Sequence, residues 1–244
     1  MLSQKVGQVE HGDNHHEAVA GEAEQFMSVA AHDLRNPIAV VRASAQMAQR
    51  QMGRGDPEGA LARLKAIVEQ TDRLTDMLEV FLDAARVNGS RLPLRVEQVD
   101  LRDVVELAAE RARFLLSEPG ERVVDCTIPD GCVGLWDRPK IVRAVRALIS
   151  NAMMYGDPAA PVRVEARRNG DRVHLTVSGG GAGPDADEVE HLFERFYRGP
   201  SAAEAGQSGS GLGLFTARGI ARSHGGDVRR LEGDCFEIEL PLTG

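Results

Sequence analysis

The segment from Phe26 to Met47 constrains the fold more than any other part of the chain. Its apolar residues recur at positions 26, 29/30, 34, 37/38, 41 and 45. Intervals of three and four residues predict an amphipathic helix with one apolar face. The next segment repeats this spacing in two stripes, so a second long helix is expected. The first stripe comprises Leu61, Leu64, Val68, Thr71, Thr75, Leu78, Leu82 and Ala85, and the second comprises Ile67, Leu74, Met77 and Phe81.

A short turn separates the two predicted helices. The first should run from about Glu22 to Met52, because Gly53-Arg54-Gly55 supplies glycine for a left-handed C-terminal cap. Asp56-Pro57-Glu58 begins the second with a capping aspartate and a proline at the first helical position. The resulting antiparallel hairpin has an apolar face too wide to bury alone. We expect two hairpins to pair as a four-helix bundle in a homodimer, with packing onto the chain's own C-terminal part as the alternative.

Three polar residues of the first helix fall off its apolar stripe and are expected to face water. They are His32, Asp33 and Asn36, within the sequence HDLRNP. His32 and Asn36 are four residues apart and therefore share one face of the helix. An exposed imidazole is mostly uncharged at neutral pH and can act as a nucleophile. An asparagine one turn away can position a water molecule, although a lone exposed histidine is by itself weak support for a site.

The C-terminal part has a different pattern, in which short β-type runs alternate with helices. Strands are predicted at 94–99, 123–128, 132–136, 162–167, 172–178, 226–231 and 235–241, and helices at 101–116, 139–155 and 212–224. Asn169-Gly170-Asp171 predicts a hairpin between two of these strands. Helices mixed with mainly antiparallel strands indicate an α+β sandwich. The predicted organisation is a flexible tail (1–21), a helical domain (22–86), a linker (87–93) and a C-terminal domain (94–244).

Composition narrows the class of protein. The formal net charge of −8 argues against a nucleic-acid partner, which would require a basic face. The sequence has no apolar run long enough to span a bilayer and no apolar core of a signal peptide. Cys126, Cys132 and Cys235 form no C-x-x-C motif and are odd in number, so we expect reduced thiols in a cytoplasmic protein.

A glycine-rich segment precedes the last predicted helix. It reads Gly209-Ser210-Gly211-Leu212-Gly213-Leu214. Glycines let backbone N–H groups approach a polyphosphate closely, and the helix N-terminus adds partial positive charge. This pattern alone is a weak indication of phosphate binding.

Together, these motifs resemble those of two-component sensor histidine kinases. HDLRNP resembles the phosphoacceptor box, H-[ED]-L-R-[TN]-P, and GSGLGL resembles the second glycine box of the ATP-binding domain. LISNAMMY (148–155) resembles the asparagine box, FERFYR (193–198) the phenylalanine box, and VSGGGAGP (177–184) the first glycine box. The five boxes stand in the family's order between residues 25 and 241.

The resemblance implies a HisKA-type dimerisation and phosphotransfer hairpin, followed by an ATP-binding α/β sandwich of the Bergerat, or GHKL, type. The γ-phosphoryl group of ATP would pass to His32, with Asp33 as hydrogen-bond acceptor or general base. Phosphohistidine would then pass the group to an aspartate of a response-regulator receiver domain. Asn36 matches the position linked to dephosphorylating that partner, and Arg198 matches a phosphate-contacting arginine.

The resemblance also implies ATP and Mg²⁺ as ligands, with the side-chain oxygen of Asn151 holding the metal through the nucleotide. The implied nucleotide-binding positions are Asn151, Tyr155, Gly181, Gly183, Gly209, Ser210, Gly211, Leu212, Gly213 and Leu214. Besides a second copy of the chain and the receiver domain, a separate sensor protein docking on the N-terminal tail is a candidate partner.

Three positions depart from the family pattern. Gly179 replaces the aspartate that accepts a hydrogen bond from the adenine amine, Ala147 replaces the first asparagine of its box, and Met154 replaces a basic residue. A hydrogen bond to a charged group contributes about 1.5–3 kcal/mol, so its loss should weaken nucleotide binding by about 10- to 100-fold. Asp185 and Asp187 are candidate substitutes.

These departures keep two alternatives open. The first is a degenerate kinase that acts as a dimeric scaffold or phosphotransfer partner with little or no ATP turnover. The second is a non-kinase ATPase that shares only the ATP-binding domain. HDLRNP on a bundle helix argues against the second alternative, because such relatives lack the phosphoacceptor hairpin.

Overall fold

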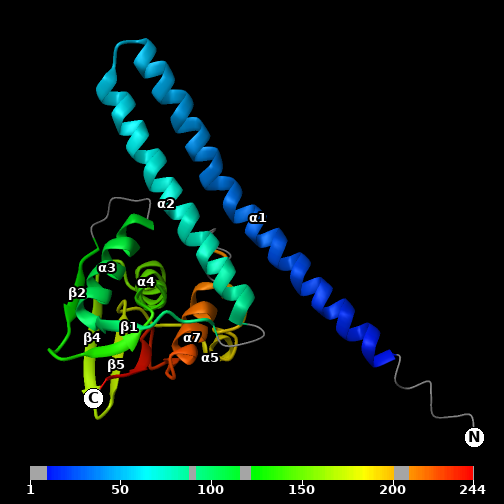
Figure 1. Cartoon of the computed structure of the whole chain (residues 1–244), viewed down its shortest axis with the longest axis vertical. Coiled ribbons are helices and arrows are strands. Elements are labelled where there is room, and N and C mark those ends of the chain that lie inside the picture. The colour runs from blue at the N-terminus through cyan, green and yellow to red at the C-terminus, as the bar shows by residue number, and fades with distance from the viewer. Residues whose placement is uncertain (1–9, 88–91, 116–121, 201–208, 244) are drawn as a thin grey trace, which may run out of the picture. The chain divides into compact units, whose positions relative to one another are not determined.

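The structure, a computed structural model, describes residues 10–87, 92–115, 122–200 and 209–243 (Figure 1). The chain divides into two compact units, with the boundary between Thr75 and Asp76 inside the second helix. That helix therefore contributes residues to both units. Among the residues that the structure describes, no helix is both long enough and apolar enough to cross a membrane. The predicted linker at 87–93 lies mostly outside the described ranges.

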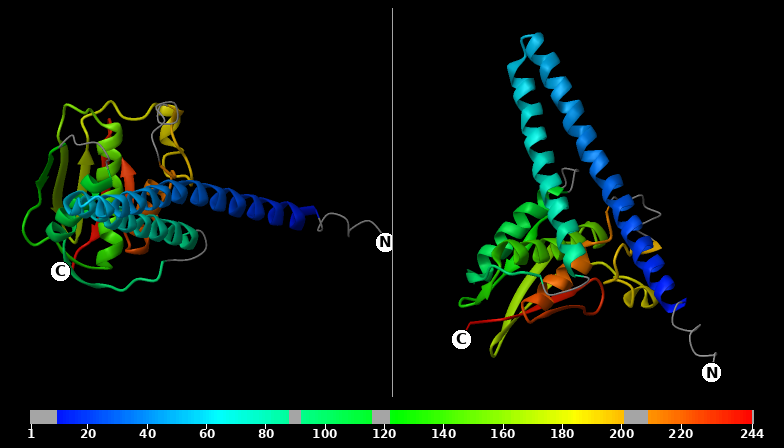
Figure 2. Two further views of the ribbon diagram at one scale, coloured as in Figure 1. Left: turned by 90° about the horizontal axis from the view of Figure 1, so that it is seen from above. Right: turned by 45° about the vertical axis from the view of Figure 1, so that its right-hand side comes forward.

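The N-terminal unit contains the predicted helical hairpin, built from α1 (Glu10–Gly53) and the first part of α2 (Pro57–Val87) (Figure 2). Gly55 adopts φ 76° in the turn, and the Asp56 carboxylate accepts a 2.9 Å hydrogen bond from the Gly59 amide. Both predicted caps are therefore confirmed. They work as expected because only glycine adopts that φ without strain, and the aspartate satisfies an otherwise unpaired N–H group.

The predicted start of the first helix was wrong. α1 begins at Glu10 instead of Glu22, so residues 10–21, assigned to a flexible tail, are helical, while 1–9 lie outside the described residues. Extending an existing helix adds one hydrogen bond for each residue ordered and needs no new nucleus. The sequence EAVAGEAE (17–24) is rich in alanine and glutamate, which favour helix. α1 also continues through Pro37.

The C-terminal unit is an α+β sandwich, as predicted. Its larger sheet has the strand order β2-β4-β5-β7-β6, and a small second sheet pairs β1 with β3. β2 runs parallel to β4, whereas the other neighbours are antiparallel. The strands are β1 (Glu97–Asp100), β2 (Val124–Thr127), β3 (Val133–Trp136), β4 (Val162–Asn169), β5 (Arg172–Ser178), β6 (Asp227–Arg230) and β7 (Phe236–Pro241).

Three longer helices pack on one face of the larger sheet (Figure 1). They are α3 (Leu101–Leu115), α4 (Arg138–Tyr155) and α7 (Gly213–Ser223), and a short helix, α5 (Ala186–Val189), precedes α7. Every predicted strand and helix of this unit is present with slightly shifted bounds, including the β4–β5 hairpin at Gly170. α5 was not predicted, because four residues are too few to show a helical period.

The core lies between this face of the sheet and the helices. Strand residues at alternate positions, such as Val173, Leu175 and Val177, are fully buried, as the two-residue period of a strand requires. Ile149 of α4 and Trp136 are also fully buried there. Trp136 is the only tryptophan of the chain, so its fluorescence reports on the folding of this unit.

The opposite face of the sheet is polar, yet it contains the fully buried Glu237. Its carboxylate lies 3.1 Å from Arg167 and 3.2 Å from His174 Nδ1, and it also pairs with Arg229. Burial alone would raise the pKa of Glu237, but the hydrogen bonds from His174 and Arg229 outweigh it and lower that pKa. The ladder of opposite charges across β4 to β7 therefore keeps this carboxylate ionised.

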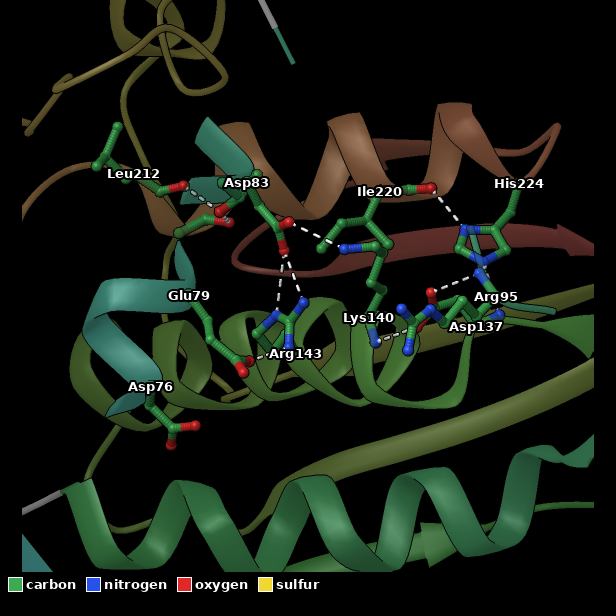
Figure 3. Close-up of polar contacts among 12 residues, drawn as sticks. Asp76, Glu79, Asp83, Arg95, Asp137, Lys140, Arg143, Leu212, Ile220 and His224 are labelled. Carbon is green, nitrogen blue, oxygen red and sulfur yellow. Dashed lines mark hydrogen bonds and ion pairs between the residues drawn. The ribbon is translucent and has the colours of Figure 1, made fainter. Parts of the chain in front are cut away.

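The start of α4 is fixed by Asp137, which was predicted to lie near its N-terminus. Asp137 accepts hydrogen bonds from the backbone amides of Lys140 (3.2 Å) and Arg95 (2.9 Å). Its own amide donates to His224 Nε2 at 3.0 Å, while His224 Nδ1 lies 2.8 Å from the Ile220 carbonyl oxygen (Figure 3). His224 is therefore a neutral ring that carries its proton on Nδ1 and joins the end of α7 to the start of α4.

Charged residues from the last turns of α2 pack on α4 within the C-terminal unit. Asp83 is 2% exposed and lies 3.0 Å from Lys140 Nζ and 2.8 Å from Arg143 Nη2 (Figure 3). Glu79 also pairs with Arg143. Removing one partner of a buried ion pair leaves the other charge buried and uncompensated. This cluster therefore fixes the position of α4 relative to the end of α2.

The geometry of His224 predicts a pH-dependent stability. Burial is the largest influence on its pKa and lowers it, because the charged ring loses contact with water. The Asp137 amide also donates to Nε2, which must be unprotonated to accept this hydrogen bond. Near pH 6.5 and below, the histidine ring therefore binds a proton more readily in the unfolded chain than in the folded chain. The stabilisation is therefore complete above about pH 6.5 and declines as the pH falls below it.

The measurement is urea unfolding followed by Trp136 fluorescence at pH 7.5 and 5.5. We expect the midpoint of the native chain to fall more between these pH values than that of His224→Gln, which has no titrating ring. Equal falls in the two proteins would contradict this role of His224.

Candidate functional site

The HDLRNP segment of α1 presents His32 to solvent. Its side chain is 75% exposed, and Nδ1 lies 3.3 Å from Asp33 Oδ1. Asn36 is also exposed, one turn along the helix. Asp33 was expected to face water but is only 17% exposed. The arrangement orients the imidazole while leaving the far ring nitrogen accessible.

The last turns of α4 carry the asparagine box. Asn151 is half-buried and Tyr155 is 42% exposed. Burial raises the pKa of the Tyr155 phenol, and the positive charge of Arg198 opposes that rise. The asparagine and phenylalanine boxes therefore lie within electrostatic range of each other.

The second glycine box packs against the phenylalanine box at Gly211, where there is no room for a side chain. Gly211 adopts φ 67°, and a Cβ there would lie 2.6 Å from the backbone carbon of Phe196 and 2.7 Å from the Tyr197 oxygen. Phe196 itself has φ 63°, which is rare for a residue with a side chain. Leu212 is fully buried, Gly213 begins α7, and a Cβ on Gly213 would lie 3.8 Å from that of Ala147. Ser210 and Leu214 are half-buried, and Gly209 is exposed.

Ion pairs hold α7, which follows this glycine box, against β6. Asp227 lies 2.9 Å from Arg218 Nε and 3.0 Å from Arg222 Nε. Burial would raise the pKa of Asp227, but hydrogen bonds from Arg218 and Arg222 outweigh it and lower the pKa to about 2. The carboxylate is thus ionised at any pH where the protein would function.

The first glycine box forms a loop after β5 that is held by an aspartate from a distant turn. Asp234 accepts hydrogen bonds from the amides of Gly179 (2.8 Å) and Gly181 (2.9 Å) and from Ser178 Oγ (3.0 Å). Gly183 packs on the same β6–β7 turn, at Gly233. Asp234 was not predicted, because no local sequence pattern identifies a residue so far along the chain as a partner of this loop.

The two proposed substitutes for the missing aspartate lie elsewhere. Asp185 is the N-cap residue of α5, where its amide donates to Glu188, and Asp187 lies inside that short helix. In the described part of the chain, no hydrogen bond joins either carboxylate to Gly179 or Gly181. Asp234 is the carboxylate that the structure places at this loop.

Arg122 is a second residue that the sequence analysis missed. Its guanidinium donates to the carbonyl oxygens of Ala152 (2.9 Å) and Met153 (2.8 Å) at the end of α4. It also donates to the carbonyl oxygens of Asp157 and Gly179. A cation suits the partial negative charge at a helix C-terminus. Arg122 therefore ties the last turn of α4 to the first glycine box.

The donor set fits a magnesium ion only if it is bound together with a nucleotide. In the ranges that the structure describes, no three His, Cys, Asp or Glu side chains form a cluster that could hold a metal ion. The amide oxygen of Asn151 is a suitable hard ligand, but a single ligand cannot fill six positions. Phosphate oxygens and water would have to supply the others.

Comparisons with known proteins identify the family of both parts of the chain. Residues 22–90 match the family model of the His Kinase A (phospho-acceptor) domain. Residues 136–244 match the model of the histidine kinase-, DNA gyrase B- and HSP90-like ATPase. The Sensor-like histidine kinase SenX3 of Mycolicibacterium smegmatis is 28% identical over 223 residues, covering 88% of this chain and 56% of that protein. The Sensor histidine kinase MtrB of Mycobacterium leprae is 32% identical over 225 residues, covering 90% and 39%.

A solved structure shows the same fold. The histidine kinase AdeS of Acinetobacter baumannii superposes with a TM-score of 0.57 at 21% identity, covering 87% of this chain and 98% of that one. A phosphoacceptor hairpin followed by a GHKL-type sandwich defines the class as a histidine kinase. The chain belongs to the sensor histidine kinases of two-component systems. It spans about half the length of the curated relatives it matches.

The tight packing of the first glycine box predicts that it tolerates no side chain at position 179. A Cβ there would collide with the Ala152 carbonyl oxygen and would lie 2.9 Å from the Gly156 Cα. Because both are backbone atoms, Gly179→Ala should destabilise the C-terminal unit by about 1–3 kcal/mol. Gly209→Ala is the control, since its Cβ would meet open space in the described part of the chain.

The measurement is urea unfolding followed by Trp136 fluorescence. A Gly179→Ala protein as stable as the control would show that this loop can move away from α4. The same collision predicts that Gly179→Asp destabilises the unit instead of restoring the family's usual nucleotide contact.

Proposed function

We propose that this protein is an ATP-dependent histidine kinase that phosphorylates His32 and passes the phosphoryl group to an aspartate of a response-regulator receiver domain. The observation that carries the proposal is the geometry of His32. Its ring is exposed and contacts Asp33 through Nδ1. A ring that donates its Nδ1 proton to a carboxylate presents the lone pair of Nε2 to solvent, where a phosphoryl donor can approach.

The proposed transfer conserves every atom. Nε2 of His32 forms a bond to the γ-phosphorus, the bond from that phosphorus to the β–γ bridging oxygen breaks, and ADP leaves with the electron pair. The ring then carries an extra positive charge until the Nδ1 proton leaves, which Asp33 favours by accepting it. Arg198 is suited to the charge spread over the transferring group. Magnesium held at Asn151 would neutralise phosphate charge when it is bound.

Two further steps belong to this proposal. Phosphohistidine would transfer its phosphoryl group to the receiver aspartate, with His32 regenerated as the leaving group. Asn36 shares the exposed face of His32 and is suited to placing a water molecule that hydrolyses the phosphorylated receiver. The chain would then act as kinase and phosphatase on one partner.

A degenerate kinase that serves as a scaffold or phosphotransfer partner is the second candidate function. Gly179, Ala147 and Met154 favour it, because each removes a contact that the family usually makes with nucleotide. Arg198, Asn151 and the intact second glycine box favour turnover instead. The two candidates differ in one measurable property, the formation of phosphohistidine from ATP.

The test is autophosphorylation with γ-labelled ATP and Mg²⁺. We expect acid-labile label on the native chain, because the P–N bond hydrolyses in acid, and complete loss of label in His32→Ala. Asp33→Asn should reduce the rate by about 100-fold or more, in the range typical of general acid–base groups. His16→Ala, which removes another histidine of α1, should label normally.

Acid-stable label, or label that persists in His32→Ala, would contradict the assignment of His32. No label at millimolar ATP would overturn the kinase proposal and favour the scaffold. Transfer from purified phosphorylated chain to an isolated receiver domain would then be the separate test of the second step.

We further propose that the chain acts as a homodimer through the hairpin. Leu61, Leu64 and Val68 of α2 are 54%, 52% and 60% exposed, so the hairpin itself leaves much of this apolar stripe uncovered. An apolar hollow of about 460 Å³ lies beside it, lined in part by Ala48, Met52 and Leu64. A contiguous apolar face of this kind is typical of an interface between helices in a four-helix bundle.

Charge placed on this stripe should separate the protomers. We expect the native chain to have the mass of two chains in light scattering, and Leu64→Glu/Val68→Glu to have the mass of one. Lys65→Glu changes the charge of the neighbouring exposed position and should remain dimeric. A native chain that is monomeric at micromolar concentration would contradict the proposed interface.

A further inference from the structure

We propose that Asp234 supplies the carboxylate that recognises the adenine amino group, in place of the aspartate that is missing at position 179. The inference rests on the proposed function, since it takes ATP to be the nucleotide. It assigns base recognition to the turn between β6 and β7, which none of the five sequence boxes contains.

The position of the carboxylate is the first support. An ideal Cβ on Gly179 would lie 2.8 Å from Asp234 Oδ2. That spacing is only slightly longer than the distance from Cβ to a carboxylate oxygen within one aspartate. One Asp234 oxygen therefore lies within about the reach of a carboxylate carried on position 179, although it arrives from another strand connection.

The bonding of the carboxylate is the second support. Asp234 is 6% exposed, and its described donors are the amides of Gly179 and Gly181 and the hydroxyl of Ser178. An ionised carboxylate offers about four acceptor sites, so one more donor can be accommodated. No ion pair to Asp234 occurs in the described part of the chain. A buried carboxylate held by neutral donors gains from each further N–H, which the exocyclic amine of adenine provides.

The packing around Gly179 explains why the carboxylate is carried by position 234 and not by position 179. The chain at Gly179 is pressed against the end of α4, where the Ala152 carbonyl leaves no space for a Cβ. Arg122 holds both partners through the Gly179 and Ala152 carbonyl oxygens. An aspartate at position 179 cannot enter this arrangement, whereas Asp234 reaches the loop from the β6–β7 turn, where it accepts from the amides of Gly179 and Gly181.

The alternative is that Asp234 has a purely structural role and only holds the first glycine box in place. The two readings differ in what they predict for the base. A clamp affects every nucleotide equally, because loop geometry is common to all of them. A base-recognising carboxylate affects only bases that carry a donor at position 6, and it disfavours the 6-oxo group of guanine, which is an acceptor.

Asp234→Asn separates these readings with little disturbance of the loop. The asparagine oxygen can still accept from the amides of Gly179 and Gly181, and the Ser178 hydroxyl can rotate to accept from the new NH₂ group. What disappears is the negative charge and one acceptor. Asp171→Asn is the matched control, since Asp171 is an exposed aspartate in the β4–β5 turn.

The experiment is isothermal titration calorimetry of the full chain carrying His32→Ala, so that no phosphoryl transfer can follow binding. The ligands are ATP, GTP and purine riboside triphosphate, which lacks the 6-amino group, each with Mg²⁺. We expect ATP to bind about 10- to 100-fold more tightly than the deaminated analogue. Asp234→Asn should weaken ATP binding by that factor and leave the analogue unchanged, whereas Asp171→Asn should alter neither.

Several results would overturn the inference. Equal affinities for ATP and the deaminated analogue in the parent chain would do so without any variant, as would an Asp234→Asn chain that keeps the preference or weakens both ligands alike. Absence of all nucleotide binding would overturn the inference and the kinase proposal together. Selective ATP binding that depends on Asp234, without labelling of His32 in the kinase assay, would remove the kinase proposal and leave the inference standing.

Discussion

The packing of the first glycine box against the end of α4 depends on one guanidinium. Arg122 donates hydrogen bonds to carbonyl oxygens of the last turn of α4 and of Gly179, where the end of a helix leaves carbonyl groups without partners within the helix. Because Arg122 lies immediately before β2, the edge strand of the larger sheet is coupled to the loop that follows β5. Lysine could supply the charge but not several N–H groups in fixed directions, so the geometry requires arginine.

Helix α4 is held at its other end by a different set of interactions. Asp137 caps the helix, and His224 accepts a hydrogen bond from the Asp137 amide. Asp83 forms ion pairs with Lys140 and Arg143. The helix that carries Asn151 and Tyr155 is therefore fixed at both ends, with polar groups in place of additional aromatic packing. This suits a chain with only 4% aromatic residues, whose core is mainly aliphatic.

Much of this architecture could be predicted from the sequence, because its signals are local. The cap at Asp56, the turn at Gly55 and the β4–β5 hairpin each follow from a few adjacent residues. The exposure of His32 follows from its position off the apolar stripe. Arg122 and Asp234 could not be predicted, since their partners lie far along the chain and neither sits in a recognisable motif. The early start of α1 was also missed, because helix extension depends on cooperativity more than on the composition of the added turns.

The collision between a side chain at position 179 and Asp234 limits the order in which this family member's ancestors can have changed. A lineage that began with aspartate at position 179 would have to shift one of the two side chains to acquire the present Asp234 contact, because a Cβ at position 179 would lie 2.8 Å from Asp234 Oδ2. Under the proposed role of Asp234, losing the first carboxylate before gaining the second would also weaken adenine binding. Under the proposed role of Asp234, we expect related chains to combine a small residue at one of these positions with an acid at the other.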